Sequence, residues 1–280
     1  MRAFPDFSDM SSEFWAFVKF VSEMLGYTVR SEGVVQTYTE DEIIKLCRKK
    51  NTYVSNWLIR QAVRYFDMRA DLLNSFAEDM LMDAETACAE CEPLLCLHTK
   101  DGFCCKLPLN KQKGDMKQIA YFTAIINILA EKTIRECIPD ITELGFDDDP
   151  RGLVYIWDNE RTLIGASSRR FDGAYPSIEN PQMVWEIKEY YYATTFGSRV
   201  ADGVYETQLD GYEFKELFDR TGRKVYHVLF VDAYRTWWVQ GKSYLCRIID
   251  SLNMGLVDEV IIGREVFTRW PELLKSMLCN

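Results

Sequence analysis

Two properties that would narrow the class of protein are absent from this sequence. Its uninterrupted apolar segments are shorter than the ~18 residues that a membrane-spanning helix needs. An excess of basic residues is also absent, because 33 lysines and arginines face 43 aspartates and glutamates, for a formal net charge of -10. This charge does not favour nucleic-acid binding, although it leaves room for a local basic cleft. Residues 1–6 lack the apolar core of a signal peptide, and we therefore expect a cytoplasmic protein.

Cysteines are present in an odd number, nine, which in a chain without an export signal indicates reduced thiols. Several lie close together with one histidine, namely Cys88, Cys91, Cys96, His98, Cys104 and Cys105. Cys88 and Cys91 have the spacing of a zinc-ligand pair, but the second pair is irregular. Because reduced cysteine is also an ordinary buried residue, a structural zinc is the weaker of the two interpretations.

The sequence does contain enough apolar residues for a large core. It is 48% hydrophobic and 14% aromatic, as in globular proteins, and 280 residues suffice for one large or two modest domains. The pattern is mainly helical at first and mixed later. We expect residues 1–110 to form a helical domain and residues 111–280 to form an α/β domain.

The first part contains three segments with helical periodicity, at 12–26, 41–50 and 54–74. The tight polar turn between the second and the third is compatible with a helix-turn-helix, in which Arg60 and Arg64 share one face of the third helix. The alternative is an ordinary solvated helix face.

Residues 94–109 have the pattern of a β-hairpin that turns at Asp101 and Gly102. A hairpin after a helical pair would correspond to the wing of a winged-helix domain. The helical domain could then contact DNA.

The second part is expected to alternate between strands and helices around one sheet. An apolar helix at 115–137 comes first, then two strands, a β-hairpin, a helix, a strand, a helix, a strand and a short helix. The segments between the hairpin and the last helix fall at 199–219, 225–232, 239–252 and 258–263. This order indicates a mixed sheet flanked by helices, an α/β layer architecture with an αβββαβ core.

Three charged residues stand out in the expected hairpin. Thirteen residues rich in turn formers separate Asp172 from Glu186, and Lys188 follows after Ile187. Because strand side chains alternate between faces, Glu186 and Lys188 point the same way while Ile187 points into the core. Two carboxylates and an amine at one place suit a divalent cation and a phosphate. The alternative is a turn acid and the solvent face of an edge strand.

This arrangement resembles the PD-(D/E)xK nucleases, a superfamily that includes many type II restriction endonucleases. The residue before the aspartate is Phe171, where the family has proline. Gln208 and Tyr212 further resemble the Gln-x-x-x-Tyr motif of the RecB-like and phage-exonuclease branches, although any helix offers polar pairs at this spacing. The resemblance covers residues 115–270.

The resemblance implies a Mg²⁺-dependent endodeoxyribonuclease, of restriction or phage-defence type, in which Mn²⁺ can replace Mg²⁺. Asp172 and Glu186 would hold the metal, and Lys188 would orient or deprotonate the attacking water. Gln208 would act on the phosphate side of the site, and Glu131, on the helix before the strands, would complete it.

Double-stranded DNA is the expected partner, and a homodimer is a natural way to cut both strands. The candidate DNA contacts are Arg169, Arg170, Arg199 and a basic loop with Lys106, Lys111, Lys113 and Lys117. Two other functions remain open: a RecB-like exonuclease, which the Gln208 motif favours, and a non-catalytic, winged-helix-like DNA-binding regulator.

Overall fold

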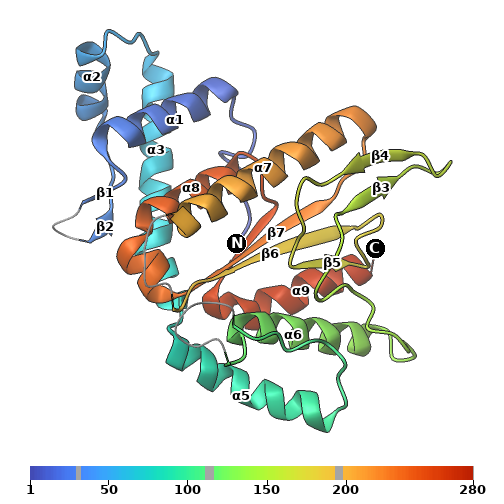
Figure 1. Cartoon of the computed structure of the whole chain (residues 1–280). Coiled ribbons are helices and arrows are strands. Elements are labelled where there is room, and N and C mark those ends of the chain that lie inside the picture. The colour runs from blue at the N-terminus through green and yellow to red at the C-terminus, as the bar shows by residue number, and fades with distance from the viewer. Residues whose placement is uncertain (30–32, 111–116, 193–197, 280) are drawn as a thin grey trace.

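A mixed four-stranded sheet organises the C-terminal part of the chain (Figure 1). The computed structural model describes residues 1–29, 33–110, 117–192 and 198–279. The sheet has the order β5 (Gly173–Tyr175), β6 (Met183–Glu189), β7 (Tyr226–Asp232) and β8 (Glu259–Ile262). β5 and β6 are antiparallel, whereas β6, β7 and β8 run parallel. β7 and β8 are almost continuously apolar because both faces of the sheet are covered, whereas β6 includes charged residues.

Helices cover both faces of this sheet (Figure 1). On one face lie α7 (Ser198–Thr221) and α8 (Lys242–Asn253), and on the other lie α5 (Ala84–Lys100), α6 (Tyr121–Cys137) and α9 (Val266–Leu278). The fold is therefore mixed α/β with helical layers around a mixed sheet, as expected from the sequence. In the described residues no helix is both long enough and apolar enough to cross a bilayer.

The N-terminal part is helical and has its own core. It consists of α1 (Ser12–Leu25), α2 (Glu40–Lys49) and α3 (Asn56–Leu72), with a short hairpin of β1 (Thr28–Val29) and β2 (Val34–Val35). The three predicted helices are confirmed. Their N-termini are capped by the side chains of Ser11, Thr39 and Ser55, and Thr39 forms a complete capping box with Glu42. α3 continues through a π-helical segment (Leu73–Ala77) into α4 (Glu78–Met80).

A buried ion pair joins the two parts. The Arg69 guanidinium on α3 is 2.9 Å from the Asp250 carboxylate on α8, and neither side chain is exposed by more than 4%. Tyr65 on α3 donates its hydroxyl to the same carboxylate at 2.6 Å. The helical part is thus packed against the face of the sheet that α7 and α8 cover.

The prediction of a hairpin at residues 94–109 is wrong, because this segment begins inside α5. Asp83 caps that helix, and Ala87 and Cys91 bury one side of it against α6 and its neighbours. Gly102, with φ +62, ends the helix. An Asp-Gly pair serves a helix C-terminus as well as a hairpin turn, since both need a left-handed residue. The described residues therefore form no winged-helix domain.

The strands before the hairpin also differ from expectation. β3 (Tyr155–Trp157) and β4 (Leu163–Ala166) pair with each other in a separate two-stranded sheet. They pack on the end of α7 instead of extending the main sheet. The outer edge of β5 is already paired, because the backbone N–H groups of Asp147 and Ala174 each donate to the other residue's carbonyl at 2.9 and 3.1 Å. A three-residue edge strand leaves no further room.

Smaller differences concern helix boundaries. α6 begins at Tyr121, and α9 begins before Pro271 rather than at it. A π-helical segment (Arg235–Gln240) precedes α8, and a 3-10 turn (Gly263–Glu265) precedes α9. Ile187 packs towards the core, as predicted.

Candidate active site

The backbone pairing of β5 and β6 brings Asp172 beside Glu186. The Asp172 N–H donates to the Trp185 carbonyl at 3.1 Å, and the Asp172 carboxylate accepts the Ile187 N–H at 2.7 Å. Gly173 permits this approach, because a Cβ at this position would overlap the buried Trp185 ring. The thirteen-residue connection therefore returns the chain to the point that the sequence pattern predicted.

Glu186 and Lys188 point from β6 towards α7, and both are nearly buried. Lys188 Nζ donates to Glu186 Oε1 at 2.7 Å and to Glu206 on α7 at 2.9 Å. Gly203 on α7 leaves space for the lysine stem, since a Cβ there would lie 3.2 Å from Lys188 Cε. The expected pair of residues on one face of the strand is confirmed in its geometry.

Two acidic residues of α7 that the sequence analysis did not single out complete the cluster. Glu206 and Asp210 are one helical turn apart and face β6. Arg169 lies between them and Glu186: its guanidinium donates to Glu186 Oε1 at 2.7 Å and to Asp210 Oδ2 at 2.9 Å. The sequence signal was the buried stripe of α7, in which Asp210 occupies a core position.

The charges in this cluster perturb one another strongly. The surrounding protein and the neighbouring Glu186 carboxylate raise the pKa of Asp172 above its usual value, although the side chain is exposed to solvent. Burial also raises the pKa of Asp210 to about 7, against the opposing effect of Arg169. For Glu186 burial acts upward, but Lys188 and Arg169 outweigh it and leave the pKa below its usual value. Burial works against the charge of Lys188, yet Glu186 holds its pKa above the usual range.

Asp172 and Ile187 also line a pocket of about 320 Å³. Glu189, Tyr190 and Arg199 form part of its wall. Glu189 is the last residue of β6, and its carboxylate accepts the Phe122 N–H at 3.0 Å, which caps α6 from outside the helix. The side of Asp172 away from Glu186 is thus open to a small ligand.

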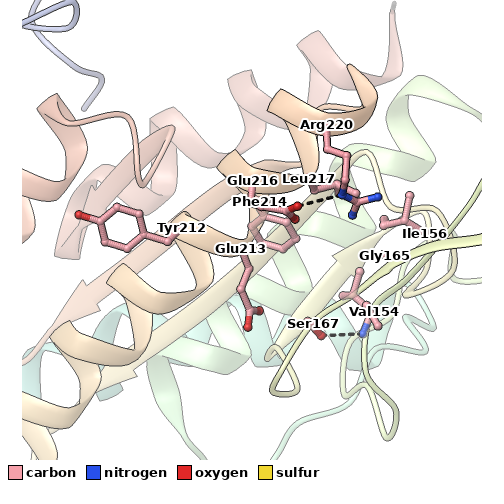
Figure 2. A pocket seen from close by; sticks show the side chains of 11 residues that line it. Val154, Ile156, Gly165, Ser167, Tyr212, Glu213, Phe214, Glu216, Leu217 and Arg220 are labelled. Carbon is pink, nitrogen blue, oxygen red and sulfur yellow. Dashed lines mark hydrogen bonds and ion pairs between the residues drawn. The ribbon is translucent and has the colours of Figure 1, made fainter. Parts of the chain in front are cut away.

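A second pocket, of about 330 Å³, lies between the β3–β4 hairpin and the end of α7 (Figure 2). Tyr212 and Glu213 line it, and Arg220 pairs with Glu216 at its upper rim. Its wall is mainly apolar and includes Ile156 and Leu217. The pocket contains no cluster of charges like the one around Glu186.

Two further predicted site residues lie elsewhere. Gln208 donates to the Ser251 hydroxyl on α8 at 3.0 Å and lines a pocket between α1, α7 and α8. Tyr212 is half exposed at the neighbouring pocket of Figure 2. The structure does not bring either to Lys188, because residues 208 and 212 lie on a different side of α7 from Glu206 and Asp210.

Glu131 is also occupied away from the cluster. Its carboxylate accepts the backbone N–H groups of Cys104 and Cys105 at 2.7–2.9 Å and pairs with Arg135 at 2.5 Å. It therefore anchors the segment after α5 to α6, and it does not complete the site around Asp172.

The basic residues expected to contact DNA differ in their exposure and in their partners. Arg170, Arg199 and Lys117 are exposed, whereas Arg169 is turned inwards. Lys106 pairs with Asp148 and Asp149 at 3.4 and 3.6 Å. Lys111 and Lys113 lie outside the described residues. In the helical part, Arg60 is exposed and Arg64 pairs with Asp6 at 2.9 Å.

In the described ranges, no group of three or more His, Cys, Asp and Glu residues is arranged to hold a metal ion. Cys88, Cys91, Cys96 and His98 are spread around α5, and the His98 ring bonds the Cys105 carbonyl at 2.9 Å. Asp172 and Glu186 are two carboxylates, too few for a closed protein cage. They suit Mg²⁺, which keeps several waters and takes one or two carboxylates together with substrate phosphate oxygens. Among the described residues Glu186 Oε2 and Asp210 Oδ1 are buried and have no hydrogen-bond partner, which fits oxygens that bind a cation.

Two family models match the chain. Residues 82–277 match a Domain of unknown function (DUF7687), and residues 1–76 match a second Domain of unknown function (DUF7690). The chain belongs to the DUF7687 family. The DUF7687 segment contains the sheet, α5 to α9 and the whole Asp172 cluster, and it begins earlier than the boundary that we expected at residue 110. No curated protein and no solved structure matches the chain.

Proposed function

We propose that this DUF7687 protein is a Mg²⁺-dependent endodeoxyribonuclease with a site of the PD-(D/E)xK type. The observation that carries the proposal is that Asp172, directly before β5, bonds the Ile187 N–H of β6, between Glu186 and Lys188, which bond each other. β6 is followed by a helix and a parallel strand, as in the αβββαβ order, although β3 and β4 stand apart from the sheet. Mn²⁺ is expected to replace Mg²⁺.

The charges of the cluster support a divalent cation. With all groups ionised, the four carboxylates of Asp172, Glu186, Glu206 and Asp210 carry -4, and Arg169 and Lys188 together carry +2, which leaves -2. One Mg²⁺ would balance this charge. Asp172 and the unpartnered oxygen of Glu186 would hold it. The bound ion would activate a water and neutralise charge on the phosphate.

Lys188 acts in this proposal as a cation rather than as a base. Its pKa lies above the usual range because Glu186 is adjacent, so the amine stays protonated at neutral pH. A protonated amine beside the phosphate would orient the attacking water and stabilise negative charge that develops in the transition state. Proton removal from the water would then fall to another group.

Internal cutting of double-stranded DNA is favoured over the alternatives. The exonuclease interpretation depended on Gln208, whose amide bonds Ser251 instead. The regulator interpretation needed a hairpin wing, where the chain forms α5. We retain restriction or phage defence as the biological setting and a homodimer as the active form.

A plasmid-cleavage assay tests the proposal. Purified protein is incubated with supercoiled plasmid and Mg²⁺, and nicked and linear products are followed. Asp172→Asn and Lys188→Met should each lower the rate by about 10²–10³-fold, the loss typical for one transition-state group. The matched controls are Asp219→Asn and Lys215→Met, which change exposed residues of α7 and should cut normally.

Cleavage that persists in Asp172→Asn and in Lys188→Met would refute the assignment. Loss of closed circular plasmid speaks for an endonuclease, since an exonuclease needs a free end. End labelling of the products should find a 5′-phosphate, and sedimentation should find a dimer on DNA.

A further inference from the structure

Arg169 points inwards, into the acidic cluster around Glu186. Two hydrogen bonds fix the backbone around it. Ser167 donates its hydroxyl to the Arg169 carbonyl at 2.7 Å, and the N–H of the preceding residue, Ser168, donates to Glu213 at 3.0 Å. Arg170, the next residue, is exposed. The chain therefore presents one arginine to solvent and directs its neighbour into an acidic site.

The Arg169 guanidinium contacts three carboxylates. It lies 2.7 Å from Glu186, 2.9 Å from Asp210 and 3.5 Å from Glu206. About a quarter of the side chain, 24%, remains exposed, so one side of the group faces solvent. The guanidinium is the main positive charge that the protein itself places on Asp210.

A divalent cation at this site would compete with that guanidinium. Glu186 Oε1 already accepts hydrogen bonds from both Arg169 and Lys188, and Glu186 Oε2 is buried without a partner among the described residues. Two positive groups on one carboxylate repel each other, and their repulsion is strong where water is excluded. Binding of a divalent ion to Glu186 would therefore weaken the hold of that residue on Arg169.

Arginine is suited to move from a carboxylate to a phosphate. Its planar fork of donors matches both groups bidentately, and its charge persists at every working pH. Asp210, which is fully buried, would keep its bond to Nη1 of the guanidinium while Nη2, which bonds Glu186, becomes free.

We propose that Arg169 is a displaceable counterion: it neutralises Glu186 and Asp210 while the site holds no divalent cation, and it turns to a substrate phosphate when the cation binds. This inference rests on the proposed nuclease function, and it assigns Arg169 a cation-dependent contact to the substrate phosphate in place of a permanent surface DNA contact.

Calorimetric titration of Mg²⁺ into the metal-free full chain, without DNA, tests the competition. In Arg169→Gln the competing charge is gone, and the dissociation constant for Mg²⁺ should fall about tenfold. Arg169→Lys keeps the charge but loses the fork, and its dissociation constant should fall by roughly threefold. Arg170→Gln, the matched control at the exposed neighbour, should bind Mg²⁺ as the wild type does.

Cleavage kinetics at saturating Mg²⁺ provide the second readout. Arg169→Gln should raise KM for plasmid by about tenfold or more, because a bidentate phosphate contact is lost. An unchanged or weaker affinity for Mg²⁺ in Arg169→Gln would overturn the inference. If the glutamine variant does not fold, the same result in Arg169→Lys would overturn it.

The two proposals fail in different ways. If the wild type cuts no DNA but Arg169→Gln binds Mg²⁺ more tightly, the nuclease function fails and the counterion stands. If cleavage depends on Asp172 but the Mg²⁺ affinity does not respond to Arg169, the nuclease function stands and the counterion is wrong.

Discussion

The buried ion pair between α3 and α8 allows a sharp test of how the two parts of the chain are joined. Arg69 is completely buried and contacts the Asp250 carboxylate, the Ser22 hydroxyl at 3.3 Å and the rings of Tyr27, Tyr65 and Phe66. Removal of one partner leaves the other charge in a site that water does not reach. Arg69→Met or Asp250→Leu should each lower the free energy of unfolding by about 3–5 kcal/mol.

The double variant is expected to behave differently from the sum of the single ones. Arg69→Met with Asp250→Leu leaves no uncompensated charge and replaces both side chains by apolar groups of similar size. Replacing a buried pair by apolar groups is often neutral, but here the buried Tyr65 and Ser22 hydroxyls lose their partners, so the loss should be about 1–2 kcal/mol. Tyr65→Phe removes only one hydrogen bond to the carboxylate and should cost about 1.5–3 kcal/mol.

Urea unfolding, followed by circular dichroism and tryptophan fluorescence, measures these values. One cooperative transition in the wild type is expected, because the ion pair ties the helical part to the layer of α7 and α8. Single variants that lose less than about 1 kcal/mol, or a double variant whose loss equals the sum, would refute the reasoning.

Three further predictions follow from the site. Gly173→Ala should lower the free energy of unfolding by about 3 kcal/mol, since the new methyl group overlaps the buried Trp185 ring, and urea unfolding would contradict this if the loss were below about 1 kcal/mol. Because the folded-state pKa of Asp210 is raised to about 7 from 3.8, the fold favours the neutral acid and loses stability as pH rises from about 4 to 7. Thermal unfolding of the metal-free protein should therefore occur at a lower temperature at pH 8 than at pH 5.5, and Asp210→Asn should reduce the difference, whereas an equal difference would exclude Asp210 as its cause. Mg²⁺ at ten times its dissociation constant should stabilise the protein by about 1.4 kcal/mol, or roughly 2–3 °C, and this shift should vanish in Asp172→Asn.

The local features of the fold could be predicted from the sequence because their causes are local. Thr39 followed by Glu42 is a capping box, and it starts α2 where expected. The continuous apolar run at residues 225–232 indicated a buried strand, which is β7 (Tyr226–Asp232). The alternation at Glu186 and Lys188 placed both on one face of β6.

The predictions that failed concern segments whose local sequence is compatible with more than one structure. Asp101 and Gly102 suit a hairpin turn, but a left-handed glycine also ends helices, and only packing against α6 decides between them. β3 and β4 were recognised as strands, yet their separation from the main sheet depends on Asp147, which occupies the edge of β5. Asp147 pairs with Ala174, which lies beyond both strands in the sequence, and local patterns do not reveal such a pairing.

The α7 residues show how the candidate site was only partly predictable. Gln208 fits a motif by spacing, but the buried stripe of α7 runs through Thr207, Asp210 and Phe214. An acid in an otherwise buried stripe needs a charged partner, because an unpaired buried charge is costly. Asp210 was therefore the stronger sequence signal for a residue that faces the site, and Arg169 is its partner.

The acidic net charge of the chain takes on a different meaning beside this cluster. The carboxylates of the metal-free site outnumber its two cations and disfavour phosphate, and Arg169 is tied to carboxylates rather than free to meet a phosphate. In the proposed mechanism a divalent cation reverses both conditions: it neutralises the site and releases the arginine. Metal binding would thus control entry of the substrate as well as its hydrolysis. An acidic protein with such a site needs no broad basic surface at the reacting phosphate, because positive charge appears there only when the metal does.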